Sequence, residues 1–179
     1  MIKFREPTAE ETSKIQESLH RWIGKDIFGK IFSGKVLVIG EGKIKEVFLV
    51  PMEVYNVFRK VKDIRMPYYL GLFFGEINGE FKISLEGLWL ISKYSREKGV
   101  VVSDKGEQLF LYGQDILEES VIKIGSLVQT GSKVVVFNRF YEPLGLGVLV
   151  RYPSRHVKKV GHVVVKNILD RGWYLRRGK

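Results

Sequence analysis

The sequence has 179 residues, enough for one or two domains with a hydrophobic core. It contains no cysteine, which excludes a disulfide framework, a thiol nucleophile and a cysteine-based metal site. The formal net charge of +10 lies in the last third, because residues 121–179 hold 12 Lys and Arg against 2 Asp and Glu, whereas residues 1–120 hold 18 of each sign. Charge concentrated in this way favours a polyanion, and first of all a nucleic acid, as the partner.

Nothing in the sequence indicates export or a membrane. The most apolar run, residues 68–75, is far shorter than the roughly 20 residues that span a bilayer. Residues 1–11 lack the apolar core of a signal peptide. We therefore expect a cytoplasmic protein, or a nuclear or nucleolar one if the chain is eukaryotic, that contacts no membrane.

The first element is predicted to be a helix over residues 8–22. Thr8 followed by Glu11 forms a capping box, in which each side chain bonds a backbone N–H left free by the first turn. Gly24 would end the helix. Four apolar residues at helical spacing are expected to face the interior: Ile15, Leu19, Trp22 and Ile23. His20 lies beside this stripe and is interpreted as a packed or surface residue.

Two apolar runs flank Glu41-Gly42-Lys43 and predict a β-hairpin between residues 31 and 50. Residues 29–36, GKIFSGKV, match most of a phosphate-loop pattern, with Lys35 as its lysine. Val36 stands where magnesium binding needs Ser or Thr, and a strand follows where a helix should. We interpret the segment as a glycine turn between short elements.

The rest of the first domain is predicted to alternate helices and strands. Pro51 at a first turn, followed by Val54, Val57, Phe58 and Val61, predicts a second helix. Strands over residues 68–76 and 80–85 flank Asn78-Gly79, a strong hairpin signal. A third helix over residues 85–94 should bring Leu88, Trp89 and Ile91 to the interior. Residues 1–95 thus form an α+β domain.

The remainder is predicted to be mostly β. Strands are expected at residues 100–103, 121–125, 133–137, 146–152 and 162–168, with a short buried helix within residues 108–120. Five or six strands favour a barrel-like closure, which removes exposed edges. Gly145 and Gly147 would allow the close approach of a packed helix or of a ligand.

Several motifs carry a family resemblance. FLYGQDIL, VVVF, PLGLGVLVR and VVVKN, in this order, resemble a PUA domain, a small pseudo-barrel found in RNA-modifying and ribosome-assembly proteins. Together with REPTAEET and LGLFFGEINGEFKISLEGLWLI, they are similar to the Nip-seven family of large-ribosomal-subunit biogenesis factors, in an archaeal-type version. The resemblance covers nearly the whole chain.

The resemblance implies an α+β protein with an N-terminal α/β domain at residues 1–95, whose sheet is mainly antiparallel, and a C-terminal PUA pseudo-barrel at residues 96–179. It also implies a non-catalytic factor without a cofactor or small-molecule substrate. Such a factor would act in pre-rRNA processing and large-subunit assembly, contact assembly factors and be linked to the RNA exosome. RNA binding is expected in the PUA half, and the charge asymmetry independently falls there. Single-stranded, U-rich RNA is the expected ligand, and the N-terminal half would dock partners, through exposed residues of the helix at 51–62.

The RNA-binding candidates are basic and aromatic residues of the last third. Arg151, Arg155, Lys158 and Lys159 leave the strand of the two glycines in one segment, where their side chains would reach phosphates. Tyr152 would either stack on a base or close the barrel. The secondary candidates are Arg139, Arg176 and Arg177. His156 and His162 have no nearby carboxylate and make a poor metal site.

An RNA-modifying enzyme is the weaker interpretation. Asp26, Asp63 and Glu86 are isolated acids, with no partner at a useful spacing for acid–base catalysis. Two alternatives stay open: a protein-interaction module whose basic face binds an acidic protein, and an accessory subunit of an RNA-modifying enzyme.

Overall fold

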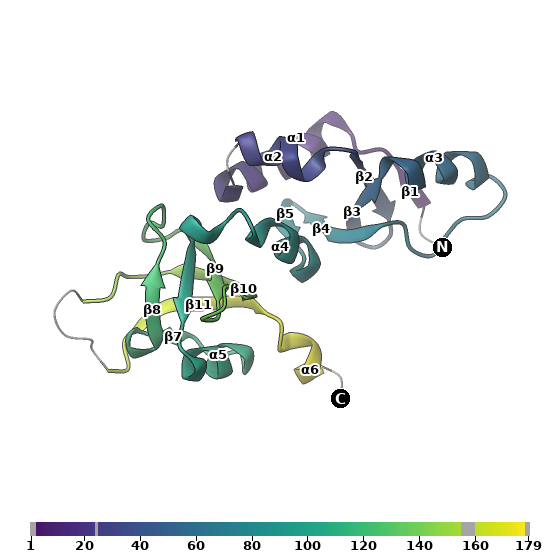
Figure 1. Cartoon of the computed structure of the whole chain (residues 1–179). Coiled ribbons are helices and arrows are strands. Elements are labelled where there is room, and N and C mark those ends of the chain that lie inside the picture. Colours follow the sequence, from purple (N-terminus) through teal and green to yellow (C-terminus); the bar gives the residue numbers. More distant parts are fainter. Residues whose placement is uncertain (1–2, 24, 155–159, 178–179) are drawn as a thin grey trace. The chain divides into compact units, whose positions relative to one another are not determined.

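The computed structural model describes residues 3–23, 25–154 and 160–177. The chain forms two compact units, Met1–Ile91 and Ser92–Lys179, which we call unit 1 and unit 2. Each has its own sheet (Figure 1). Helices on an antiparallel sheet, followed by a barrel-like sheet, confirm the predicted α+β class.

Unit 1 is built on a five-stranded antiparallel sheet of order β1-β2-β3-β4-β5. Its elements are β1 (Lys3–Arg5), α1 (Ala9–Ile23), α2 (Lys25–Phe32), β2 (Lys35–Glu41), β3 (Lys45–Pro51), α3 (Met52–Val61), β4 (Leu72–Asn78), β5 (Glu80–Ile83) and α4 (Leu85–Ser92). Both predicted hairpins are confirmed: β2 pairs with β3, and β4 pairs with β5 around Gly79, whose φ is 72°. Strand β4 begins later than predicted, directly after Gly71 at φ 78°.

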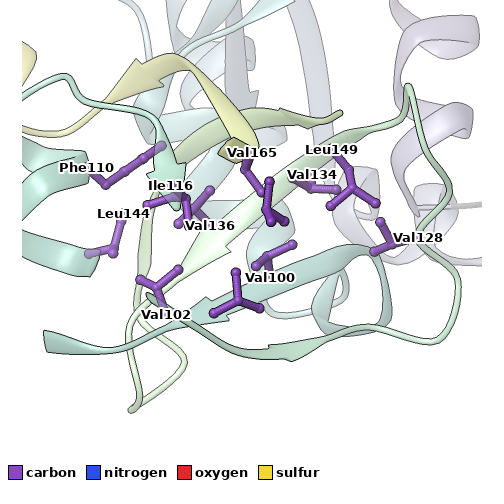
Figure 2. Packing of buried hydrophobic residues seen from close by; sticks show 12 residues of the cluster. Val100, Val102, Phe110, Ile116, Val128, Val134, Val136, Leu144, Leu149 and Val165 are labelled. Atoms are coloured by element: carbon purple, nitrogen blue, oxygen red, sulfur yellow. The ribbon is translucent and has the colours of Figure 1, made fainter. Parts of the chain in front are cut away.

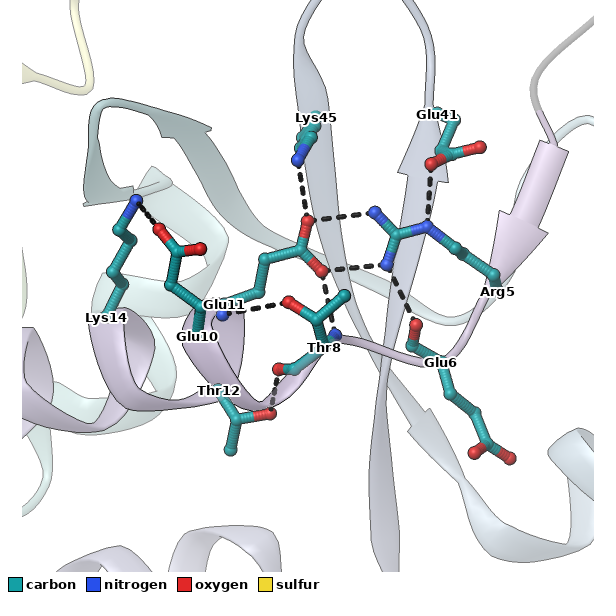
Figure 3. A network of polar contacts seen from close by, with 9 residues as sticks. All are labelled: Arg5, Glu6, Thr8, Glu10, Glu11, Thr12, Lys14, Glu41 and Lys45. Atoms are coloured by element: carbon teal, nitrogen blue, oxygen red, sulfur yellow. Dashed lines mark hydrogen bonds and ion pairs between the residues drawn. The ribbon is translucent and has the colours of Figure 1, made fainter.

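Helix α1 begins with the predicted capping box. Thr8 N donates to Glu11 Oε2 at 2.9 Å, and Glu11 N donates to Thr8 Oγ1 at 3.2 Å. The Glu11 carboxylate also accepts hydrogen bonds from Arg5 Nη1, Arg5 Nη2 and Lys45 Nζ at 2.7, 2.8 and 2.8 Å (Figure 3). Hydrogen bonding to Arg5, more than to Lys45, holds the pKa of Glu11 well below its usual range. The network ties the start of α1 to β1 and β3.

The predicted inward face of α1 is confirmed at Ile15, Leu19 and Ile23, which are buried. The side chain of Trp22 and all of Gly24 lie outside the described residues. His20 is half-buried and contacts Phe28 of α2 with 5.3 Å between ring centroids, as expected for a packed residue.

Helix α2 corrects the prediction of a glycine turn at residues 29–36. Gly29 lies inside this helix, and the turn comes later, at Gly34 with φ 67°. Phe28 and Phe32 stack with 4.2 Å between ring centroids, and Phe32 also contacts Phe74 of β4. This packing holds the segment helical despite the glycine. A helix before Lys35 and a strand after it are the reverse of a phosphate loop.

Helix α4 follows the prediction for Leu88 and Ile91, which are buried, but not for Trp89, whose side chain is 52% exposed. Consecutive helical residues point about 100° apart. Leu88 and Trp89 therefore cannot both face one core.

Helix α3 packs one edge of its apolar stripe against the sheet. Phe58 is buried and makes an edge-to-face contact with Phe4 of β1, at 6.0 Å between ring centroids. Phe4 in turn contacts Phe48 of β3 at 5.5 Å. The predicted second helix is therefore confirmed, and its core contact is an aromatic cluster on β1 and β3.

Unit 2 contains a six-stranded sheet of order β7-β11-β10-β9-β6-β8. Its elements are β6 (Gly99–Val102), α5 (Asp104–Leu111), β7 (Ile116–Leu117), β8 (Val121–Ile124), β9 (Lys133–Phe137), β10 (Pro143–Leu149), β11 (Val163–Asp170) and α6 (Trp173–Arg177), with 3₁₀ turns at Arg96–Lys98 and Glu118–Ser120. Only β6 and β9 pair in parallel among the described strands. The predicted strand at 146–152 lies three residues earlier, because Pro143 opens β10 instead of ending a loop.

The core of unit 2 lies between the curved sheet and α5. The predicted buried helix within residues 108–120 lies earlier, as α5, because Ser103 caps its start by accepting from Gly106 N, and residues 116–117 form strand β7 instead. Phe110 of α5 is fully buried. In Figure 2 its ring lies beside Ile116 and Leu144 at one end of a cluster of mostly valine side chains. The labelled cluster contains Val100, Val102, Phe110, Ile116, Val128, Val134, Val136, Leu144, Leu149 and Val165.

The two glycines of β10 make room for a strand. A Cβ on Gly145 would collide with Leu169 O of β11, and a Cβ on Gly147 would lie 2.7 Å from Lys166 O. The register of β10 and β11 shifts between Leu146 and Gly147. The predicted close approach is thus real, but the neighbour is β11 and not a packed helix or a ligand.

Candidate nucleic-acid interface

The basic candidates of unit 2 sort to two ends of strand β10. Arg139 precedes Pro143, the first residue of β10, and Arg151 follows Leu149, its last. Seven residues of strand span about 20 Å. β11 is antiparallel to β10, with Gly145 opposite Asp170 and Leu149 opposite Val165. Arg176, which bonds Asp170, therefore lies at the Pro143 end with Arg139, whereas Arg151 lies at the Leu149 end.

Arg151 and Tyr152 meet the chain segments around the Leu149 end. Arg151 Nη1 lies 3.1 Å from His162 Nδ1, and because a guanidinium only donates, this imidazole nitrogen accepts. The Tyr152 hydroxyl donates to Val128 O, while half of its side chain stays exposed. The hydroxyl of Tyr152 thus joins the barrel edge to Val128, whereas stacking of its ring on a base stays a prediction.

The segment that follows Tyr152 is held at both ends by the turn Glu118–Ser120. Ser154 N donates to Glu118 Oε1 at 2.7 Å, and Glu118 N donates to His162 O at 2.8 Å. Gly161 N donates to the carboxylate of Glu119 at 3.3 and 3.4 Å. Glu118 is almost completely buried, so this anchor belongs to the folded core. Between the anchored ends, Arg155, Lys158 and Lys159 lie outside the described residues.

Two further lysines share the Leu149 end and were absent from the sequence prediction. Lys133 of β9 and Lys166 of β11 both lie opposite Val148 of β10, so the three residues form one row across neighbouring strands. Residues directly opposite on neighbouring strands point to the same face of a sheet. Both lysines are exposed, and neither has an ion pair among the described residues. The strand register reveals this row, which residue spacing in the sequence does not.

The Pro143 end contains Arg139 in a closely bonded turn. Arg139 Nε pairs with Asp104 Oδ1 at 2.8 Å, and both side chains are well exposed. Asn138 Oδ1 accepts from the backbone N–H groups of Phe140 and Glu142, each at 3.0 Å. The turn holds Phe140 out in solvent. An exposed ion pair is weak, so Arg139 remains accessible to a competing phosphate.

Arg176 has a structural task at the same end. Its Nη1 and Nη2 donate to the two oxygens of Asp170 at 2.9 and 2.8 Å, and Nη1 also donates to Leu111 O at the end of α5. The hydrogen bonds to Asp170 raise the pKa of Arg176. Arg176 of α6 thereby joins the buried Asp170 of β11 to the end of α5. Arg177 ends α6, and its side chain lies outside the described structure.

The described residues offer little to other kinds of site. Among them, no three His, Asp or Glu side chains gather closely enough to hold a metal ion. No helix in the described ranges has the length and apolar character needed to cross a membrane. Of the two histidines considered as metal ligands, His162 lies against the cation Arg151, and His156 lies outside the described residues.

Two family models match successive parts of the chain. The NIP7/UPF0113 pre-PUA domain matches residues 4–85, and the UPF0113 PUA domain matches residues 98–179. A UPF0113 protein of Archaeoglobus fulgidus is 36% identical over 180 aligned residues, covering 99% of this chain and 97% of the relative. The 60S ribosome subunit biogenesis protein NIP7 of Saccharomyces cerevisiae is 28% identical, over 97% of this chain and 96% of the relative.

Solved structures share the fold at low identity. A conserved PUA domain protein from Thermoplasma acidophilum superposes with a TM-score of 0.57 and 15% identity, covering 95% of both chains. A hypothetical protein from Pyrococcus horikoshii OT3 gives a TM-score of 0.59 at 14% identity, covering 97% of this chain and 99% of that one. These likenesses confirm the predicted fold class.

Proposed function

Since this chain belongs to the NIP7/UPF0113 family, we propose that it is a non-catalytic RNA-binding factor in the assembly of the large ribosomal subunit. Unit 2, which contains the predicted PUA domain at residues 96–179, would bind single-stranded or looped pre-rRNA. Unit 1, residues 1–95, would dock other assembly factors, with the exosome as one proposed contact. The cytoplasm is the proposed location in an organism without a nucleus.

One observation supports RNA as the partner above all. The surplus of basic charge falls in the last third of the chain, and in unit 2 exposed cations without an ion pair gather at the Leu149 end of β10. Lys133, Lys166 and Arg151 are the described members of this group, and Arg155, Lys158 and Lys159 follow Arg151 in the sequence. Tyr152 adds an exposed ring beside them. Cations for phosphates next to an aromatic ring for a base are what single-stranded RNA requires.

The test is fluorescence-anisotropy binding of a U-rich single strand and a matched duplex across a salt series. For the intact chain, four phosphate contacts predict a slope of log affinity against log salt near −3, from about 0.7 per single-strand phosphate. Changing Arg151, Arg155, Lys158 and Lys159 to Ala should remove most of that slope. If the lysine row also contacts phosphates, six contacts predict a steeper slope near −4 for the intact chain, and K133A/K166A should remove about 1.4 of that slope.

A matched control removes the same charge elsewhere. Changing Arg59, Lys60, Lys62 and Arg65 of unit 1 to Ala lowers the net charge by the same four units and should leave the RNA slope unchanged. If both quadruple variants lost the same part of the slope, RNA affinity would depend only on total charge, which would contradict a binding surface on unit 2. Failure of the intact chain to bind RNA would favour the alternative, a basic face that binds an acidic protein.

A further inference from the structure

Unit 1 exposes a concentrated apolar surface on α3 and the segment that leads to β4. Of the 21 large apolar side chains that are exposed among the described residues, eight lie within residues 52–72. We call them the α3 surface: Met52, Val54, Val57, Val61, Ile64, Tyr68, Tyr69 and Leu72. Val57 is 61% exposed, Ile64 85% and Tyr68 83%. Single exposed apolar residues are ordinary, but a dense group of them marks an interaction site.

The geometry makes this surface continuous with the core beneath it. Val54 and Val61 lie one turn before and after the buried Phe58, on the same side of α3. Val57 lies one turn from each of these two valines, at the edge of the stripe that faces solvent. Tyr69 contacts Phe48 with 5.9 Å between ring centroids, and Phe48 belongs to the same cluster as Phe58. The apolar stripe of α3 is therefore wider than the area the sheet covers.

Unpaired cations flank these apolar residues. Arg59, Lys60, Lys62 and Arg65 are all exposed, and none forms an ion pair within the described part of the chain. The acids in residues 52–72 are two, Glu53 and Asp63. The cations of the α1 network, by contrast, are bonded to Glu11 and Glu41. The border of the α3 surface thus carries positive charge with no partner of its own.

The side chains favour a protein over RNA as the ligand. Six of the eight are aliphatic, namely Met52, Val54, Val57, Val61, Ile64 and Leu72. Aliphatic side chains do not bond to phosphates and lack the aromatic face on which the bases of single strands stack, whereas their burial against another apolar surface is favourable. The two tyrosines, Tyr68 and Tyr69, are compatible with either ligand.

We propose that the α3 surface docks an acidic amphipathic segment of a partner protein. Apolar residues of that segment cover Val54, Val57 and Val61, and its acidic residues pair with Arg59, Lys60, Lys62 or Arg65. The proposal rests on the adaptor role given to unit 1 above. It extends the surface predicted on the helix at 51–62 as far as Leu72 and adds the chemistry of the partner. It concerns a unit distinct from the one that would bind RNA.

The test uses three fluorescein-labelled peptides of about 20 residues with the intact chain. The first is an amphipathic helix former with Leu on one face and Glu on the other, the second has Lys in place of Glu, and the third is a scrambled version of the first. We expect measurable binding of the Glu peptide only. V57D/V61D should weaken it about tenfold or more, and because both valines are exposed, circular dichroism of this variant should match that of the intact chain.

Charge reversal separates specific docking from general stickiness. Changing Arg59, Lys60, Lys62 and Arg65 to Glu should exchange the preference, so that the Lys peptide binds and the Glu peptide does not. Equal binding of all three peptides by the intact chain would overturn the proposal. So would a loss of U-rich RNA affinity in V57D/V61D, which would make the surface an RNA site. Sedimentation could also show that the intact chain self-associates and that V57D/V61D abolishes this association. The occupant of the α3 surface would then be a second copy of the chain, which would also overturn the proposal.

The outcomes separate this proposal from the proposed function. Normal salt-dependent RNA binding without peptide binding would overturn only the docking surface. Peptide binding that V57D/V61D abolishes, in a chain that ignores RNA, would overturn only the RNA-binding role.

Discussion

Changing Glu11 to Gln tests how much the carboxylate at the start of α1 stabilises unit 1. Gln keeps the size of the side chain and its capping role, but removes the charge that faces Arg5 and Lys45. Hydrogen bonds to charged groups contribute about 1.5–3 kcal/mol each, and breaking a fully buried ion pair costs about 3–5 kcal/mol. Glu11 is buried, whereas Arg5 and Lys45 regain water when freed. We expect E11Q to lower the free energy of unfolding at pH 7 by about 2–3 kcal/mol.

The pH dependence of this difference has a definite sign. The pKa of Glu11 is lowered in the folded chain, chiefly by its hydrogen bonds to Arg5, so the unfolded chain takes up a proton first as the pH falls. The stabilisation is therefore complete above the unfolded pKa of about 4.3 and is lost as the pH falls from there toward the folded pKa. Urea denaturation followed by far-ultraviolet circular dichroism should show a constant gap between intact chain and E11Q from pH 7 to about pH 5.5, and a shrinking gap below about pH 4.

The neighbouring Glu10 supplies the control. It lies in the same turn of α1 and, within the described ranges, forms an ion pair with Lys14 alone, one turn away on the exposed surface. E10Q makes the same chemical change without touching the network, and its unfolding midpoint should match that of the intact chain. A gap for E11Q that stays constant down to pH 3, or an effect of E10Q as large as that of E11Q, would refute the reasoning.

Three further substitutions test single features. Gly29→Ala should raise the free energy of unfolding in urea by about 0.5–1 kcal/mol, because Gly29 lies inside α2 with open space at its Cβ position; a loss of stability would argue against a helix there. Gly145→Ala should abolish the native near-ultraviolet signal of unit 2, since its Cβ would collide with β11, and an intact signal would contradict this packing. Asp170→Ala should lower the calorimetric melting temperature of unit 2 by roughly 4–8 °C, because it removes both acceptors of the Arg176 fork; an unchanged transition would show that the pair contributes nothing.

Features that depend on neighbouring residues were predictable from the sequence. The capping box joins residues only three apart, and Thr8 with Glu11 forms it as expected. The hairpin at Asn78-Gly79 also follows from two adjacent residues. Phe28, Ile31 and Phe32 have helical spacing as well, and giving that spacing more weight than Gly29 would have predicted α2.

Features that depend on distant partners were not predictable. Arg139 and Arg176 are basic residues of the expected region, but Asp104 and Leu111, which they meet in the fold, come from α5. Lys133 and Lys166 become neighbours of one row only through the register of β9, β10 and β11. Periodicity in α3 showed which residues share a side of the helix, but not that Val57 lies beyond the sheet that covers Phe58.

The strand orders of the two sheets imply that the two units fold differently while the chain is being synthesised. In unit 1 each strand pairs with the one made just before it, so its sheet can grow strand by strand as the chain emerges. In unit 2 the short strand β7 pairs only with β11 among the described strands, and β11 is separated from it by about 45 residues of chain. The core around Phe110 and Ile116 is therefore completed only when Val165 of β11 has been synthesised. A translation pause before β11 would leave unit 1 folded and unit 2 collapsed but incomplete. The valine side chains of the unit 2 core would then be exposed, and exposed apolar surface of this kind is what chaperones bind.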